Sequence, residues 1–160
     1  MLIRIKNYNL QDITDGIKFL LDRSVRSPEV RQLALDISDK DDKISAIYDW
    51  VKSNLRYVPD PVSGEDEIEL FISPIKQVRD YRQRLSICGD CDDNALLATA
   101  LYQAIGIRSN VVIIDSVGNG FDHAFSQAWS DKLQDWVDID PTSKYPLCWK
   151  LSYKDRIIVN

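Results

Sequence analysis

The chain has 160 residues, a length typical of one domain that buries a substantial core. Hydrophobic residues make up 44% and charged residues 28%, which indicates a soluble globular protein. The net charge of -5 argues against nucleic acid as a main partner, because phosphate binding needs a basic surface. The sequence has no apolar run long enough for a signal peptide or a membrane span, and three cysteines are too few for a disulfide scaffold. We therefore expect one cytoplasmic domain, 1–160, with no membrane partner.

The first half of the chain is predicted to be helical. Apolar residues recur at helical spacing, and Ser27-Pro28 is typical of an N-cap followed by proline in the first helical turn. The predicted helices are 10–25, 28–37 and a third that starts at Asp41 or Asp42 and reaches Leu55, and together they make 1–56 a helical N-terminal part. Residues 57–73 contain Pro59, Pro61 and Gly64 and break every regular pattern. We expect a long loop there, of the kind that is usually functional or mobile.

The second half is predicted to combine helices with antiparallel strands. Ser73-Pro74 begins a short helix that ends before Ser86. Asp90 is a good N-cap, with Asp93 as its capping-box partner, for a helix that ends near Gly106. The predicted strands are 110–114, 121–129, 134–140 and 156–159, of which the middle two form a hairpin. Helices followed by antiparallel strands indicate an α+β fold.

Cys91 is predicted to lie in the first turn of the helix that Asp90 caps. The helix dipole and the free backbone N–H groups of this turn favour a thiolate and can hold an oxyanion. Asp92 and Asp93 work against the thiolate because they are anions. A cationic partner is therefore needed, and His123, the single histidine, is the candidate near neutral pH.

The predicted hairpin supplies His123 with a carboxylate in either of two registers. A four-residue turn over Ser130–Leu133 pairs Trp129 with Gln134 and sets His123 opposite Asp140. A two-residue turn at Ser130-Asp131 sets His123 opposite Asp138 instead. Either carboxylate would orient the imidazole and stabilise its charged form. The residues alone leave both registers open.

Three other interpretations compete for the same residues. Cys91 is an inert buried thiol in the first, since free cysteines are often buried. In the second, Cys88 and Cys91 form a CxxC redox motif, which normally follows a strand, whereas 81–87 is charged and irregular. The third is a zinc site made by Cys88, Cys91, Cys148 and His123, which lacks a second closely spaced ligand pair. Trp129 and Trp136 either wall the site against water or belong to the core.

Three ordered motifs resemble those of the transglutaminase-like superfamily. GDCDDNALLATALYQAIGI is similar to its cysteine motif, HAFSQAW to its histidine motif and WVDIDPT to its aspartate motif, over 89–142. The resemblance implies a papain-like fold, in which a nucleophile helix packs on an antiparallel sheet. It implies a catalytic core at 89–142 with Cys91 as nucleophile, His123 as general base and acid, and Asp140 as the orienting carboxylate. The segment upstream of the cysteine motif is similar to small proteins of this type encoded by bacteriophages and prophages.

The implied activity is cysteine-dependent acyl transfer on amides of a protein or peptide substrate, without a cofactor. It would make the chain a peptidase or deamidase if water accepts the acyl group, and a protein cross-linker if an amine does. The alternative is an inactive phage structural or interaction module, with other phage proteins as partners and a virion-associated location. No metal is expected: 39–42 lacks the glycine and distal glutamate of a calcium loop. Cys88 departs from the family pattern, and Tyr57 and Gln83 are candidate oxyanion donors of which neither is preferred.

Overall fold

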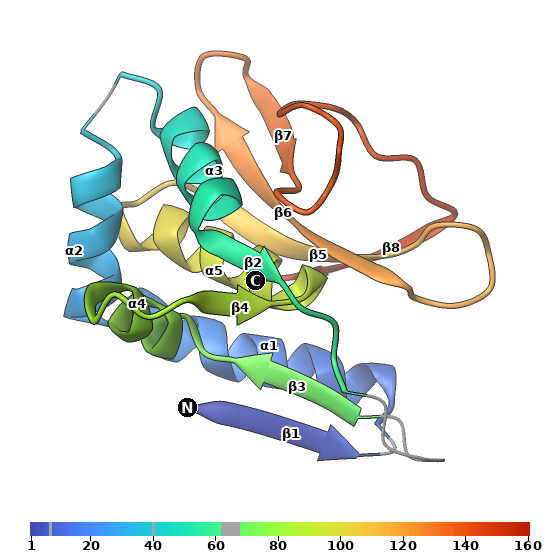
Figure 1. Cartoon of the computed structure of the whole chain (residues 1–160). Helices are drawn as coiled ribbons and strands as arrows, with labels where there is room; N and C mark the ends of the chain where they lie inside the picture. Colours follow the sequence, from blue (N-terminus) through green and yellow to red (C-terminus); the bar gives the residue numbers. More distant parts are fainter. Residues whose placement is uncertain (7, 40, 62–67) are drawn as a thin grey trace.

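A central helix, α5, is enclosed by a four-stranded sheet on one side and by four other helices on the other (Figure 1). The computed structural model describes residues 1–6, 8–39, 41–61 and 68–160. The helices of this part are α1 (Leu10–Val25), α2 (Pro28–Ile37), α3 (Lys43–Asn54), α4 (Pro74–Arg82) and α5 (Cys91–Ala104). Its strands are β1 (Leu2–Lys6), β2 (Leu55–Tyr57), β3 (Ile68–Ile72), β4 (Ile87–Gly89), β5 (Ser109–Asp115), β6 (His123–Ser130), β7 (Asp135–Ile139) and β8 (Asp155–Val159).

The main sheet is antiparallel, with the strand order β7-β6-β5-β8. Its inner face packs against α5, where Thr99 and Ser126 share a buried hydrogen bond of 2.7 Å between their hydroxyl oxygens. Nearly every residue of α5 is buried, since helices cover the sides that the sheet leaves free. A helix that is enclosed all round is held by packing rather than by its own propensity. The N-terminus of α5 is therefore a fixed point of the fold.

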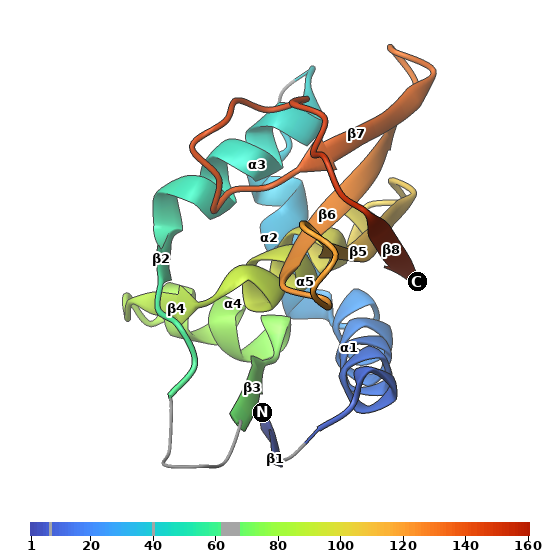
Figure 2. The same ribbon diagram turned by 90° about the vertical axis from the view of Figure 1, so that its right-hand side faces the viewer.

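Two short ladders bring distant segments to the N-terminal end of α5. β1 pairs with β3 in antiparallel orientation, and β2 pairs with β4 in parallel orientation. The second ladder aligns Tyr57 with Gly89 and is extended by a hydrogen bond from the Val58 N–H to the Gly89 carbonyl, at 3.0 Å. Figure 2 shows β2 and β4 side by side, with the chain after β2 running toward β3. Consequently, residues after β2 and in β3 lie close to the start of α5.

The predicted α+β class is confirmed, as are all five predicted helices and all four predicted strands, to within a few residues at their ends. Strands β1 to β4 were not predicted. The expected loop at 57–73 is wrong in part, because β3 occupies its C-terminal end; residues 62–67 of it lie outside the described part. These four strands have three to five residues each, and none of them stands in a hairpin pattern that the sequence would reveal. Among the described residues, we find no helix with the length and apolar character that crossing a membrane requires.

Both predicted hairpin registers are wrong by at least two residues. Trp129 pairs with Trp136 and Ser130 with Asp135, so the turn is Asp131–Gln134. Gln134 takes a left-handed conformation, with φ 53°, which carries the turn one residue farther than predicted. The register also places the two tryptophan rings edge to face, with centroids 5.8 Å apart, a favourable cross-strand pair. Asp138 therefore faces Gln127 and accepts a hydrogen bond of 2.7 Å from its amide.

Candidate active site

Cys91 is the first residue of α5 and lies half-buried at the wall of a cavity. The backbone N–H groups of a first helical turn have no partner within the helix, so they can hold a negative charge close to the sulfur. The cavity has a volume of about 320 Å³. Its polar and aromatic lining consists of Tyr8, Tyr57, Asp60, Glu69, Asp90, Cys91, Asp92, Phe121, Asp122 and His123.

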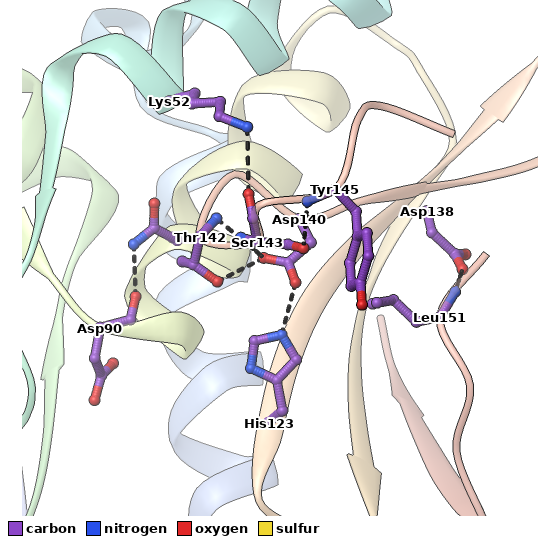
Figure 3. A network of polar contacts seen from close by, with 10 residues as sticks. Lys52, Asp90, His123, Asp138, Asp140, Thr142, Ser143, Tyr145 and Leu151 are labelled. Atoms are coloured by element: carbon purple, nitrogen blue, oxygen red, sulfur yellow. Dashed lines mark hydrogen bonds and ion pairs between the residues drawn. The ribbon is translucent and has the colours of Figure 1, made fainter. Parts of the chain in front are cut away.

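His123 begins β6, and Asp140 follows directly after β7. The Nε2 atom of His123 lies 2.8 Å from Oδ2 of Asp140 (Figure 3). The other oxygen of this carboxylate accepts three hydrogen bonds, from the backbone and hydroxyl of Thr142 at 3.0 and 2.6 Å and from the Ser143 N–H at 3.2 Å. The carboxylate is thus fixed on one side and turned toward the imidazole on the other.

The imidazole of His123 interacts with both Asp140 and Cys91. Since Nε2 is taken by Asp140, Nδ1 is the ring atom left for the thiol. Burial lowers the pKa of His123, but hydrogen bonds to Asp140 and Cys91, and the charges of both groups, raise it to about 10. Burial raises the pKa of Asp140. The hydrogen bonds from His123 and Thr142 outweigh this effect and hold the pKa of that carboxyl below its usual value. The histidine is therefore an imidazolium at neutral pH.

Gly89 allows α5 to begin where it does. A Cβ atom on this residue would lie 2.5 Å from the Cβ atom of Asp93, closer than two such atoms can approach. Asp93 in turn accepts a hydrogen bond of 2.7 Å from the Ile72 N–H, which ties the first turn of α5 to the end of β3. A side chain at position 89 would displace this link and with it the turn that carries Cys91.

The acidic residues around Cys91 differ from what the sequence predicts. Asp90 occupies the N-cap, but its side chain accepts no capping hydrogen bond, and the capping box with Asp93 is absent. Burial and the contact with Asp90 raise the pKa of Asp92 well above its usual range. Burial likewise raises the pKa of Asp93 to about 8, although the bond from Ile72 lowers it. Asp92 and Asp93 do lie in the first turn of α5, as predicted, but both carboxyls are buried there.

Two further carboxyls at the cavity were not predicted. Asp60 follows β2, and burial together with the charge of Asp90 raises its pKa to about 6. Glu69 lies in β3, and its pKa is also raised, chiefly by burial. Both residues fall in the segment predicted as a loop, where nothing in the sequence pattern indicates what they face.

The structure does not bring the predicted zinc ligands together. Cys148 is exposed and lines a different cavity, beside the β6–β7 turn, and all three cysteines are free. Contrary to expectation, a short strand, β4, lies at this motif and contains Cys88, but no disulfide joins Cys88 to Cys91. Trp129 and Trp136 do not line the cavity of Cys91, and neither does Gln83, whereas Tyr57 does.

Several solved structures share the fold. A provisionally named protease from Parabacteroides distasonis is 18% identical with a TM-score of 0.57, over 83% of this chain and 26% of its own. A provisionally named cysteine protease from Cytophaga hutchinsonii is 21% identical with a TM-score of 0.56, over 99% of this chain and 60% of its own. LapG of Legionella pneumophila, in a calcium-bound structure, is 16% identical with a TM-score of 0.51, over 88% and 76%. The chain thus spans about a quarter and three fifths of the first two proteins.

The sequence itself carries the family assignment. No curated protein matches the chain significantly. The sequence pattern of the transglutaminase-like superfamily matches residues 30–141, more than half of the chain and a range that includes Cys91, His123 and Asp140. The structural neighbours show the same fold, a helix packed on an antiparallel sheet. The chain belongs to the transglutaminase-like superfamily.

Proposed function

We propose that the chain is an enzyme of cysteine-dependent acyl transfer that acts on amide groups of a protein or peptide. Cys91 is the nucleophile, His123 the general base and acid, and Asp140 the orienting carboxylate. The observation that carries this proposal is the chain of contacts from Asp140 through His123 to Cys91, at the wall of an open cavity. The family assignment and the fold support it, since the three residues lie in the family's order.

The first half-reaction follows from the charges of the pair. The Cys91 sulfur attacks the amide carbonyl carbon, an S–C bond forms, and the carbonyl oxygen becomes an oxyanion at the first turn of α5. The C–N bond then breaks as His123 donates its proton to the leaving amine. A thioester on Cys91 and a free amine result. Asp140 holds the imidazole in the orientation that this proton transfer requires.

The second half-reaction returns the enzyme to its resting state. Water or a primary amine attacks the thioester carbonyl, and His123 accepts the proton that the attacking group loses. The S–C bond breaks, and the Cys91 sulfur leaves as a thiolate beside the imidazolium. Water as acceptor gives peptide hydrolysis or deamidation, and a lysine amine gives a cross-link between proteins.

Alkylation with iodoacetamide across pH tests whether Cys91 is activated. We expect selective labelling of Cys91 below pH 7, because an imidazolium partner favours the thiolate, and at least about tenfold slower labelling in His123→Ala. Peptide mass spectrometry reads each cysteine separately, so the exposed Cys148 is an internal control. Labelling of Cys91 that rises with pH in parallel with Cys148, near pH 8.5, would contradict the proposal.

Turnover needs a separate measurement. The full chain is incubated with an unfolded protein and a fluorescent primary amine, and both new chain ends and amine incorporation are followed. We expect one of the two products with the native chain and neither with Cys91→Ser, which preserves size but lacks the thiol. Equal product from both chains would reject Cys91 as the nucleophile, and an alkylatable Cys91 without product would identify an inactive module.

A further inference from the structure

A second cavity lies on the face of the main sheet that points away from α5. Successive residues of a strand point to opposite faces. Ser126 of β6 faces α5 through its hydrogen bond with Thr99, so the next residue, Gln127, faces outward. This outer cavity is lined by β5 to β8 and by the segment between β7 and β8, and its volume is about 350 Å³, within the range of small-molecule sites. It shares no lining residue with the cavity of Cys91.

Three polar side chains form a row across the sheet in the outer cavity. Asn110 of β5 is directly opposite Gln127 of β6, and Gln127 is directly opposite Asp138 of β7. Residues that are opposite each other in an antiparallel pair share one face of the sheet. On the same face, the neighbouring pair of Val112 and Phe125 is apolar and buried. The polar row therefore interrupts a face that otherwise packs through apolar side chains.

The row holds hydrogen-bonding groups in fixed positions. Gln127 and Asp138 are only 7% and 5% exposed. Asp138 accepts from the Gln127 amide at 2.7 Å through Oδ1, and from the Leu151 N–H at 3.1 Å through Oδ2 (Figure 3). Gln127 is thereby oriented, and its Oε1 accepts from no donor among the described residues. The carboxamide of Asn110 likewise has no partner within the described ranges, so both groups are available to a ligand.

The charges around the outer cavity balance one another. Two carboxylates, Asp135 and Asp138, and two cationic side chains, Lys150 and Arg156, line it. The Lys150 ammonium is already engaged, since it donates to the Trp136 carbonyl at 2.6 Å and lies 3.4 Å from Asp135. An anionic ligand would be repelled by the carboxylate of Asp138, and a cationic ligand by the guanidinium of Arg156. The lining therefore favours an uncharged, polar ligand.

Two aromatic rings complete the lining. Trp136 is supported by Trp129, edge to face at 5.8 Å between centroids, and the Tyr153 hydroxyl accepts from Arg156 at 2.7 Å. We infer that the outer cavity binds an uncharged saccharide. Each hydroxyl of a sugar ring both donates and accepts, which suits the carboxamides of the polar row, and the C–H groups of the ring pack on aromatic faces.

The inferred site goes beyond the proposed function, because saccharide binding needs neither the thiol nor turnover. The outer cavity and the cavity of Cys91 have separate linings, so both can be occupied at the same time. A saccharide bound on the outer face of the sheet would hold the chain on a saccharide-bearing molecule and leave Cys91 accessible.

Nuclear magnetic resonance of the ¹⁵N-labelled full chain, titrated with cellobiose and with N,N′-diacetylchitobiose, tests the inference. We expect saturable shifts of the side-chain amides of Asn110 and Gln127 and of the Trp136 indole with at least one of the two saccharides, with a Kd of about 0.1–10 mM. Asn110→Ala and Trp136→Leu should each weaken binding at least about fivefold, since they remove a hydrogen-bonding group and an aromatic face. Asn110→Ala removes no side-chain hydrogen bond between described residues, so the fold should persist.

Asn160→Ala is the matched control. Asn160 and Asn110 both line a neighbouring cavity, but only Asn110 also lines the outer cavity. We expect a change in Kd within about twofold for this variant and for Cys91→Ala, which separates this test from that of the proposed function. Inorganic phosphate and adenosine are the comparison ligands and should bind more weakly. Absence of saturable shifts with both saccharides, an equal loss in Asn160→Ala, or tighter binding of phosphate or adenosine would overturn the inference.

Discussion

Asp140 is the hydrogen-bond partner that contributes most to the raised pKa of His123. Its Oδ1 is occupied by Thr142 and Ser143, so Oδ2 has a fixed direction toward the ring. The carboxylate also keeps its charge, because the same hydrogen bonds lower its pKa. A neutral residue of the same shape would retain the contact with His123 but lose the charge.

Asp140→Asn is therefore expected to leave the fold intact and to slow acyl transfer by at least about 10²-fold, since the imidazolium loses its counter-ion. Alkylation of Cys91 at pH 6 should slow as well, and by more than at pH 9. Rates of iodoacetamide labelling at the two pH values measure this difference. An equal slowing at both would point to a loss of structure rather than of charge.

The residues of the candidate site were predictable to different degrees. Cys91, His123 and Asp140 stand in motifs with their own secondary structure, so the sequence indicated all three. The structure joins His123 to Asp140 even though the hairpin register that suggested the pair is wrong. Asp60 and Glu69 carry no such pattern, because they come from a short strand and a connection whose positions depend on tertiary contacts.

The junction of β4 and α5 is the element on which the candidate site depends most. Gly89 lies against Asp93, and Asp93 holds the end of β3. Gly89→Ala should destabilise the protein by about 1–3 kcal/mol, because the new Cβ overlaps a buried side chain. It should also slow labelling of Cys91, since the first turn of α5 must move. Thermal unfolding and the labelling rate measure the two effects.

Gly106→Ala is the comparison for this junction. Gly106 follows α5 with φ +85°, and a Cβ there would meet no atom within 4 Å. The cost should be about 1–2 kcal/mol of backbone strain, with the labelling rate of Cys91 unchanged. A Gly89→Ala protein that labels as fast as Gly106→Ala would show that the close approach to Asp93 does not position the nucleophile.

Long elements were easier to predict than short ones for a physical reason. Helices α1 to α5 and strands β5 and β6 have seven to sixteen residues each, enough to show a period, and the five-residue β7 was recognised as the partner of β6 in a hairpin. β1 to β4 pair over three to five residues each, and their pairing is decided by where α4 and α5 place them. The β6–β7 register was missed because it depends on the left-handed Gln134, whose side chain gives no turn signal.

Across the whole molecule, the buried carboxyls and His123 act on stability in the same direction. A carboxyl whose pKa is raised on folding binds more protons in the folded state than in the unfolded state. The free energy of unfolding therefore falls as the pH rises toward the folded-state pKa. This pKa is about 6 for Asp60 and about 8 for Asp93. The stability that His123 contributes is fully present below about 6.5 and is lost as the pH rises through about 10. Both effects lower stability between pH 6 and pH 9.

The protein should consequently unfold at a lower temperature at pH 8.5 than at pH 6. A loss of about 2 kcal/mol corresponds to roughly 4–8 °C in Tm for a chain of this size. Calorimetry measures this difference, and Asp92→Asn should reduce it because it removes one buried carboxyl whose pKa is raised. A Tm that stays constant or rises over this range would show that ionisation of the buried carboxyls does not lower the stability of the fold.

The charge of His123 is the central claim, and the chain allows it to be measured directly, because His123 is its single histidine. Nuclear magnetic resonance of the labelled imidazole, followed from pH 5 to pH 11, reports its protonation without interference from another ring. We predict an imidazolium that persists to about pH 10 in the native chain, and a lower pKa of His123 in both Cys91→Ala and Asp140→Asn. Titration of His123 near its ordinary pKa of about 6.5, unchanged by either substitution, would contradict the account.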